Sequence, residues 1–241
     1  MKVYGIIGKS LKHSFSPRYF NNKFSDGHLD AIYETFELEK IDALPRLLQQ
    51  KQLAGINVTI PYKEQVIPFL DELDTSVESI GAVNCIQTHK GRLVGYNTDI
   101  TGFTRSLRPL LKKHHQQALV LGTGGASKAI QEGLKQLVIP FTLVSRSAEP
   151  GTITYTQIDE HLINTHPLII NTTPLGTFPD VATKPDIPYQ SLKPAHLLYD
   201  LVYNPETTAF LQEGLAKGAQ VKNGFEMLCI QAEAGWDIWN Q

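Results

Sequence analysis

Two patterns of apolar and polar positions alternate along the chain. Short apolar runs typical of buried strands are separated by longer amphipathic stretches typical of helices. Strands joined by helices form parallel sheets, so the pattern predicts an α/β fold. Before residue 100, the predicted strands are residues 3–7, 31–36 and 55–58 and a hairpin of 84–87 with 92–95, and the predicted helices are 17–24, 41–50 and 62–70.

The α/β pattern starts again after a helix predicted over residues 100–111. A polar run at 112–117 follows this helix, and such a change of composition marks a candidate domain boundary. Beyond it, the predicted strands are residues 118–121, 141–144, 168–171 and 197–201, and the predicted helices are 126–137, 207–217 and 226–239. A length of 241 residues is sufficient for two α/β domains.

Composition narrows the classes of function. The 22 basic and 24 acidic side chains leave a net charge of −2, which argues against a nucleic-acid partner. No apolar run reaches the ~18 residues of a membrane span, and the first residues lead into a strand and not into a signal sequence, so we expect a cytoplasmic protein. The two cysteines, Cys85 and Cys229, predict no disulfide framework, and the histidine spacing predicts no metal site.

A glycine-rich turn follows the predicted strand 118–121 and precedes a predicted helix. Glycine at 122 allows a tight turn, while Gly124 and Gly125 lack the Cβ atoms that would block a pyrophosphate. The N-terminus of the next helix offers N–H groups and a positive dipole to that anion. Ser127 replaces the usual third glycine, and an ordinary strand-to-helix turn is the alternative. The context favours a dinucleotide site.

The end of the next strand indicates which dinucleotide binds. An acidic residue there grips the ribose 2′-hydroxyl of NAD, and a basic residue grips the 2′-phosphate of NADP. This chain has Ser145, Arg146 and Ser147, with no carboxylate before Glu149. Because a guanidinium can bind a phosphate in a bidentate manner, we expect NADP. An exposed arginine without a ligand is the alternative.

Four short polar motifs lie at the ends of predicted elements in the first hundred residues. They are Ser14-Phe15-Ser16-Pro17, Asn57-Val58-Thr59-Ile60-Pro61-Tyr62-Lys63, Gly81-Ala82-Val83-Asn84 and Asn97-Thr98-Asp99. Each has a structural alternative: Ser16 as a helix cap, Asp99 as a cap, Lys63 as a solvated lysine and Asn84 as a turn residue. Ligands of open α/β sheets bind at the carboxyl ends of the strands. A lysine that lies beside a carboxylate in such a cleft can act with it as a proton-transfer pair.

These motifs, in their order along the chain, resemble the shikimate dehydrogenase family. The segments that carry the resemblance are residues 13–17, 57–63, 81–84, 97–99, 122–127, 171–174, 199–205 and 223–228 with Gln231. The resemblance implies NADPH-dependent reduction of 3-dehydroshikimate to shikimate in aromatic amino-acid biosynthesis. It also implies a substrate domain with a mainly parallel sheet, residues 1–99 plus 225–241, and a Rossmann-like NADP domain, residues 100–224.

The resemblance further implies a role for individual residues. Lys63 is the acid/base residue and Asp99 its partner. The implied substrate ligands are Ser14, Ser16, Asn57, Thr59, Asn84, Tyr203 and Gln231, in addition to Asp99. The implied cofactor ligands are Gly122, Thr123, Gly124, Gly125, Ala126, Ser145, Arg146, Ser147, Thr173, Leu201, Gly224 and Met227.

The chain departs from the family pattern at a few positions. Ser145-Arg146-Ser147 stands where the family usually has Asn-Arg-Thr, and Cys85 replaces a threonine after Asn84. Glu149-Pro150-Gly151 interrupts the helix that normally follows the arginine, and residues 152–155 are predicted to be extended. The second basic contact to the 2′-phosphate is therefore expected to be missing.

Two rival functions follow from the same sequence. One is an NAD-dependent quinate/shikimate dehydrogenase, which the absence of an acidic residue at 145–147 disfavours. The other is a non-catalytic nucleotide-binding regulator, which the intact Lys63 and Asp99 disfavour. For partners, we expect a small-molecule substrate and neither nucleic acid nor membrane, in a monomer or a homodimer.

Overall fold

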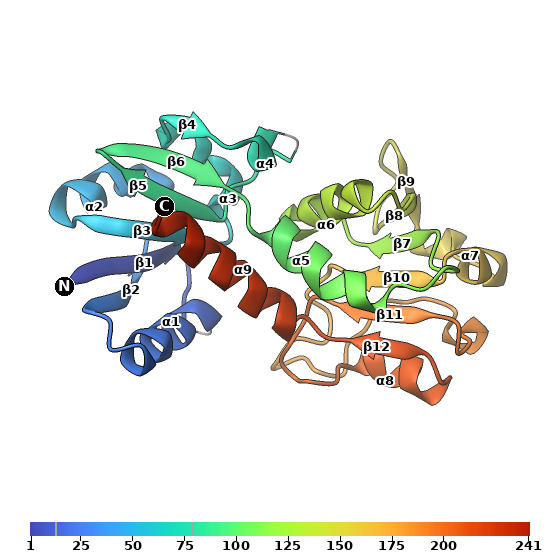
Figure 1. The fold of residues 1–241 in the computed structure, drawn as a ribbon. Helices are drawn as coiled ribbons and strands as arrows, with labels where there is room; N and C mark the ends of the chain where they lie inside the picture. Colours follow the sequence, from blue (N-terminus) through green and yellow to red (C-terminus); the bar gives the residue numbers. More distant parts are fainter. Residues whose placement is uncertain (13, 79) are drawn as a thin grey trace. The chain divides into compact units, whose positions relative to one another are not determined.

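The computed structural model describes residues 1–12, 14–78 and 80–241 and divides into two compact units. Unit 1 consists of residues 1–101 and 231–241, and unit 2 of residues 102–230. The two boundaries lie inside the helices α5 (Asp99–Leu107) and α9 (Phe225–Trp239). Each unit is a sheet flanked by helices (Figure 1), as the alternating pattern predicts. His13, in the first polar motif, lies outside the described residues.

Unit 1 contains a six-stranded sheet in the order β2-β1-β3-β5-β6-β4. The pairs β1–β2, β1–β3 and β4–β6 are parallel, while β5 runs antiparallel to both β3 and β6. Its elements are β1 (Lys2–Gly8), α1 (Phe15–Asp26), β2 (Ala31–Glu37), α2 (Leu44–Gln50), β3 (Leu53–Val58), α3 (Tyr62–Gln65), β4 (Glu72–Leu73), α4 (Thr75–Glu78), β5 (Cys85–His89) and β6 (Arg92–Tyr96).

Alternating side chains of β1 point into two separate cores on the two faces of this sheet. Tyr4 packs with Phe20 of α1 and Trp239 of α9, whereas Ile7 packs with Leu44 of α2. All of these aromatic and aliphatic side chains are buried. Because successive side chains of a strand point to opposite faces of the sheet, β1 contributes to the core under α1 and α9 on one face and to the core under α2 on the other.

Unit 2 contains a six-stranded parallel sheet in the order β12-β11-β10-β7-β8-β9. The order reverses between β7 and β10, which makes the carboxyl ends of these two strands the topological switch point of the sheet. The elements are β7 (Ala118–Leu121), α6 (Gly125–Gln136), β8 (Phe141–Ser145), β9 (Thr152–Thr154), α7 (Glu160–Thr165), β10 (Leu168–Asn171), β11 (Leu197–Asp200), α8 (Ala209–Ala216) and β12 (Gln220–Lys222).

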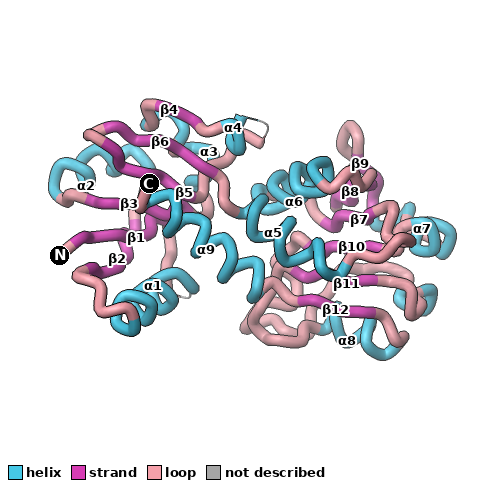
Figure 2. Tube along the Cα trace, in the orientation of Figure 1, coloured by secondary structure: helices cyan, strands magenta, loops and turns pink. Residues whose placement is uncertain are grey.

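The sheet of unit 2 is also covered on both faces. Val120 packs with the face that α5 and α6 cover, and its neighbour Leu121 packs with the face that α7 and α8 cover. The central strand β7 is therefore apolar and buried along its whole length, as expected of a parallel sheet covered on both sides. Figure 2 shows that the connection between β10 and β11 is mostly loop, and this loop supplies part of a pocket described below.

Three helix predictions were wrong in their extent. The helix predicted over 100–111 is α5, which ends at Leu107 and is followed by a 3₁₀ turn, Arg108–Leu110. The helix predicted over 62–70 is α3 followed by a 3₁₀ turn, Ile67–Phe69. Pro68 lacks an N–H group and its ring would clash with the preceding turn, so the α-helix ends before it. The helix predicted over 41–50 likewise begins with a 3₁₀ turn, Ile41–Ala43, before α2.

The connection from β8 to β9 contains no α-helix. Residues 146–151, all of which the structure describes, lead directly from β8 into β9, which pairs parallel to β8. This agrees with the prediction that the chain is extended over 152–155. Among the described residues, no helix is long and apolar enough to cross a membrane.

Candidate active site and dinucleotide pocket

A lysine–aspartate pair lies at the carboxyl end of β3 in unit 1. Lys63, in α3, places its Nζ 2.6 Å from Oδ2 of Asp99, the first residue of α5. The side chains are 21% and 13% exposed, so the pair is shielded yet accessible. Oδ1 of Asp99 accepts a hydrogen bond of 2.8 Å from Nδ2 of Asn84. Lys63 is therefore paired, and is not the solvated lysine of the alternative interpretation.

Asn84 connects this pair to a second polar group, formed by Thr98 and Gln231. The amide of Asn84 accepts a hydrogen bond of 2.8 Å from the backbone N–H of Thr98, and its Nδ2 also donates to the Thr98 hydroxyl at 3.0 Å. That hydroxyl lies 3.3 Å from Oε1 of Gln231 in α9. All three side chains are buried, so the network is held firmly.

Asn57, the residue before the last of β3, is positioned by Tyr33 of β2. The Tyr33 hydroxyl donates a hydrogen bond of 2.6 Å to Oδ1 of Asn57, and Nδ2 of Asn57 donates to the backbone carbonyl of Asn84 at 3.2 Å. Ser16 also hydrogen-bonds to Tyr33. Burial raises the pKa of Tyr33 well above its ordinary value, so its hydroxyl stays protonated. Sequence reasoning missed this tyrosine.

The first polar motif differs from its capping interpretation. Helix α1 begins at Phe15, so the cap position belongs to Ser14, and Ser16 lies inside the helix; the interpretation of Ser16 as a cap was wrong. The Ser14 side chain accepts no capping hydrogen bond. Thr59 directly follows β3, and its N–H donates to the carbonyl of Ile7.

Cys85 serves as a packing residue beside this network. Its side chain is fully buried, and burial raises the pKa of its thiol, which therefore stays protonated. The cysteine belongs to the apolar cluster that includes Tyr4 and Trp239. Its replacement of a threonine leaves Asn84 in the network described above.

The glycine turn of unit 2 lies at the switch point of the sheet. Gly122 has a φ of +106°, and a Cβ there would approach the Thr172 hydroxyl to 2.8 Å, so only glycine fits. A Cβ at Gly124 or Gly125 would meet no protein atom within 4 Å, so the backbone borders open space. Gly124 caps α6, which begins at Gly125 and continues through Ala126. A helix N-terminus facing open space suits a pyrophosphate.

Thr173 is held beside this turn by a buried polar network. Oδ1 of Asn171 accepts hydrogen bonds from the hydroxyl and the N–H of Thr173, at 2.6 and 3.0 Å, and its Nδ2 donates to Asp200 at 2.9 Å. Asp200 is fully buried, and burial raises the pKa of its carboxyl to about 6, although hydrogen bonds from Thr208 and the Val202 N–H oppose the shift.

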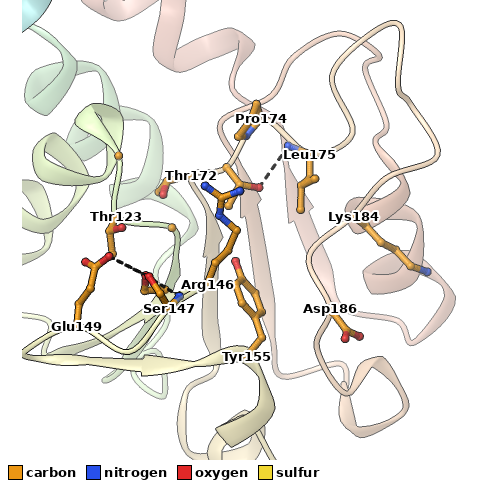
Figure 3. Close-up of a pocket in the computed structure, with 14 residues that line it drawn as sticks. Thr123, Arg146, Ser147, Glu149, Tyr155, Thr172, Pro174, Leu175, Lys184 and Asp186 are labelled. Carbon is orange, nitrogen blue, oxygen red and sulfur yellow. Dashed lines mark hydrogen bonds between the residues drawn. The ribbon is translucent and has the colours of Figure 1, made fainter. Parts of the chain in front are cut away.

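A pocket of about 640 Å³ opens between the glycine turn and the end of β8 (Figure 3). It brings together seven predicted cofactor ligands: Gly122, Thr123, Gly124, Ser145, Arg146, Ser147 and Thr173. The lining also contains residues that the sequence interpretation did not assign: Glu149, Tyr155, Thr172, Pro174, Leu175, Lys184 and Asp186. Burial raises the pKa of Tyr155, and the Arg146 guanidinium opposes that shift.

The remaining predicted residues of unit 2 lie after β11 and around the start of α9. Gly224 packs so closely that a Cβ would lie 2.1 Å from the carbonyl oxygen of Leu201. Met227 is buried in the cluster that includes Tyr199. Burial raises the pKa of the Tyr203 hydroxyl. Leu201 and Gly224 therefore lie against each other, and neither of them lines the pocket at the end of β8.

Metal ligands do not cluster in the described part of the chain: it has no group of three or more histidine, cysteine, aspartate or glutamate side chains that could hold an ion. A parallel sheet with a glycine turn at its switch point and a shielded lysine–aspartate pair define a nicotinamide-nucleotide-dependent oxidoreductase.

Known proteins match the chain over nearly its whole length. Residues 6–86 match the model of the shikimate dehydrogenase substrate binding domain. The NADP-dependent shikimate dehydrogenase of Desulforamulus reducens is 35% identical over 265 residues, which cover 99% of this chain and 89% of that protein. The chain belongs to the shikimate dehydrogenase family, as its motifs predict.

Solved structures of this family share the fold. Shikimate dehydrogenase from Aquifex aeolicus aligns with a TM-score of 0.89 and 32% identity, over 100% of this chain and 92% of that chain. The enzyme from Thermus thermophilus in complex with NADP(H) and shikimate aligns with a TM-score of 0.88 and 29% identity, over 99% and 93%. These neighbours confirm the predicted fold class.

Proposed function

We propose that this chain reduces 3-dehydroshikimate to shikimate with NADPH, with substrate bound by unit 1 and cofactor by unit 2. The observation that carries the proposal is the Lys63–Asp99 pair at 2.6 Å, inside a network of amides and hydroxyls. Family membership at 35% identity to an NADP-dependent shikimate dehydrogenase supports the reaction and the cofactor.

Lys63 is the proposed acid/base residue. NADPH supplies the hydride that reduces the substrate carbonyl. The Lys63 ammonium donates a proton to the oxygen that becomes the new hydroxyl, and in the reverse direction its amine accepts that proton. Oδ2 of Asp99 accepts a hydrogen bond from Nζ of Lys63, and Asn84 donates to the other carboxylate oxygen, which keeps the pair aligned. Proton transfer of this kind contributes ~10²–10⁴-fold to rate.

The polar groups around the pair are the proposed substrate ligands. A ring with several hydroxyls needs both donors and acceptors, and a shielded site makes an unpaired group costly. The amides of Asn57, Asn84 and Gln231 offer both. Ser14 and Ser16, near the N-terminus of the twelve-residue helix α1, suit the substrate carboxylate, because their hydroxyls donate and the helix dipole is positive there. The full proposed set is Ser14, Ser16, Asn57, Thr59, Asn84, Asp99, Tyr203 and Gln231.

The residues of unit 2 fit an NADP molecule. Open space beside Gly124 and Gly125 at the start of α6 accepts the pyrophosphate, and Arg146 in the pocket accepts the 2′-phosphate. Leu201, Gly224 and Met227 are proposed to border the nicotinamide. The proposed cofactor ligands are Gly122, Thr123, Gly124, Gly125, Ala126, Ser145, Arg146, Ser147, Thr173, Leu201, Gly224 and Met227.

Substitution of Lys63 tests the proposal directly. Lys63→Ala should lower kcat by ~10² or more, because it removes the proposed proton donor, and should change the KM for shikimate by less than about tenfold. Lys113→Ala, at an exposed lysine in the polar run, is the matched control and should leave both constants unchanged. Shikimate oxidation is followed by the absorbance of the NADPH that forms. Equal kcat in Lys63→Ala and parent would remove Lys63 from the mechanism.

The same assay separates the rival functions. Activity with NAD and quinate would favour the quinate/shikimate alternative, and nucleotide binding without turnover would favour the regulator. The shielded Lys63–Asp99 pair supports turnover, since a regulator needs no proton donor. We further propose a cytoplasmic location. We also propose that the protein is a monomer or a homodimer, and gel filtration with light scattering would distinguish these two states.

A further inference from the structure

The pocket at the end of β8 carries no excess of positive charge. Its lining contains two cations, Arg146 and Lys184, and two carboxylates, Glu149 and Asp186. Lys184 is already bound to Glu213 and lies 4.8 Å from the Tyr189 ring centroid. Figure 3 shows it at the far side of the pocket from Arg146. A site for a phosphate monoester, whose charge is about −1.5 to −2, usually gathers cations.

Glu149 lies where the 2′-phosphate is expected. Its Oε1 accepts hydrogen bonds from the hydroxyls of Ser145 and Ser147, at 3.4 and 3.3 Å. Figure 3 shows Glu149 beside Ser147. These are the two hydroxyls that flank Arg146. The sequence interpretation placed no carboxylate at this point because Glu149 comes too late in the chain. The short turn folds it back onto the serines.

The turn holds the backbone of Glu149 in place. The Thr152 hydroxyl accepts from the N–H of Glu149 at 3.3 Å and donates to its carbonyl at 3.0 Å, and the Thr152 N–H donates to the same carbonyl at 3.1 Å. Gly151 completes the turn with a φ of +78°. The fixed backbone therefore keeps the Glu149 carboxylate within reach of the hydroxyls of Ser145 and Ser147.

We propose that Glu149 sets cofactor selectivity by competing with the 2′-phosphate of NADP for Ser145 and Ser147. A bound 2′-phosphate must displace the carboxylate and then remain close to its negative charge. The 2′-hydroxyl of NAD can instead donate to the same carboxylate. Glu149 thus weakens NADP binding and supports NAD binding. The inference rests on the proposed placement of the adenosine ribose in this pocket.

Binding of 2′,5′-ADP and 5′-AMP to the full chain tests the inference without shikimate or turnover. Glu149→Gln keeps the size and the hydrogen-bonding oxygen but removes the charge. Because pairs of exposed charges contribute modestly, the ratio of affinities for 2′,5′-ADP over 5′-AMP should rise about two- to fivefold. Glu149→Lys should raise the ratio further. The gain should shrink at high salt, which a purely steric effect would not do.

Two further variants separate the possible failures. Glu160→Gln changes an exposed carboxylate outside the pocket lining and should leave the ratio unchanged. Arg146→Ala should lower the affinity for 2′,5′-ADP. If it does so while Glu149→Gln leaves the ratio unchanged or lowers it, the role of Glu149 is refuted and the cofactor site stands. If Arg146→Ala leaves 2′,5′-ADP binding unchanged, the proposed phosphate site and the role of Glu149 are both refuted.

Discussion

Tyr33→Phe removes the hydroxyl that positions Asn57. Tyr33 is 3% exposed, and its hydrogen bond to Oδ1 of Asn57 is 2.6 Å long. The ring should stay in place, because it stacks on Phe20 with centroids 4.8 Å apart. The substitution therefore leaves little space unfilled and deprives a buried amide of a partner. Such a loss costs about 1–3 kcal/mol of the free energy of unfolding.

Tyr4→Phe is a control in the adjacent strand. Tyr4 of β1 pairs with Tyr33 of β2 in the sheet register, and it is fully buried. Its hydroxyl, unlike that of Tyr33, has no hydrogen-bond partner in the described part of the chain. Removing a buried hydroxyl that makes no hydrogen bond should leave stability unchanged or raise it by about 1 kcal/mol. The same substitution at two neighbouring tyrosines should thus have clearly different effects on stability.

Urea unfolding and steady-state kinetics together give the decisive measurement. Tyr33→Phe should raise the KM for shikimate about two- to tenfold, because a misplaced amide loses a hydrogen bond of about 0.5–1.5 kcal/mol, and should leave kcat within about twofold. A purely structural role of Tyr33 would lower stability without changing KM. An unchanged KM, or equal losses of stability in both variants, would refute the reasoning.

Ser14, Arg146 and Asp200 give three independent tests. Ser14→Ala should weaken shikimate binding by about 1–3 kcal/mol with a nearly unchanged Tm, since Ser14 accepts no capping bond; a lower Tm with unchanged binding would contradict this. Arg146→Ala should raise the KM for NADP by about 10–150-fold and leave that for NAD unchanged, and an equal effect on both would exclude Arg146 as the phosphate ligand. Folding raises the pKa of Asp200 to about 6, so the folded state binds more protons and loses stability as pH rises from about 4 to about 6. Urea unfolding should show the parent losing up to about 3 kcal/mol relative to Asp200→Asn over that range, and a constant difference would refute the shift.

The strands and the polar residues at their ends were predictable from local pattern. Runs such as Ala118–Leu121 are too apolar and too short for anything but a buried strand, and Gly122 marks where that strand ends. Side chains just beyond parallel strands meet at one edge of the sheet. Lys63 and Asp99 are brought together in this way, and Asn84 joins them from the residue before the antiparallel strand β5.

Contacts that depend on neighbours in space were not predictable. Tyr33 reaches Asn57 across β1, because β2 and β3 flank that strand, and a single sequence does not show this order. Glu149 meets Ser145 only because the helix after β8 is absent and the turn is short. The sequence indicated the missing helix but not what the freed carboxylate would contact. The early end of α3, before Pro68, was by contrast visible in the sequence and overlooked.

The core of unit 1 includes Trp239 of α9, a residue that is translated after all of unit 2. Its ring occupies the space above Gly55, where a Cβ would approach it to 2.4 Å, and its indole N–H donates to the carbonyl of Ile86 at 3.0 Å. On the ribosome, residues 1–101 emerge before unit 2, but the core that Trp239 completes cannot form until residue 239 has been translated. Unit 2, which is continuous over residues 102–230, can complete its core earlier. Of the two units, the one whose strands are made earlier is therefore the one whose core is completed later.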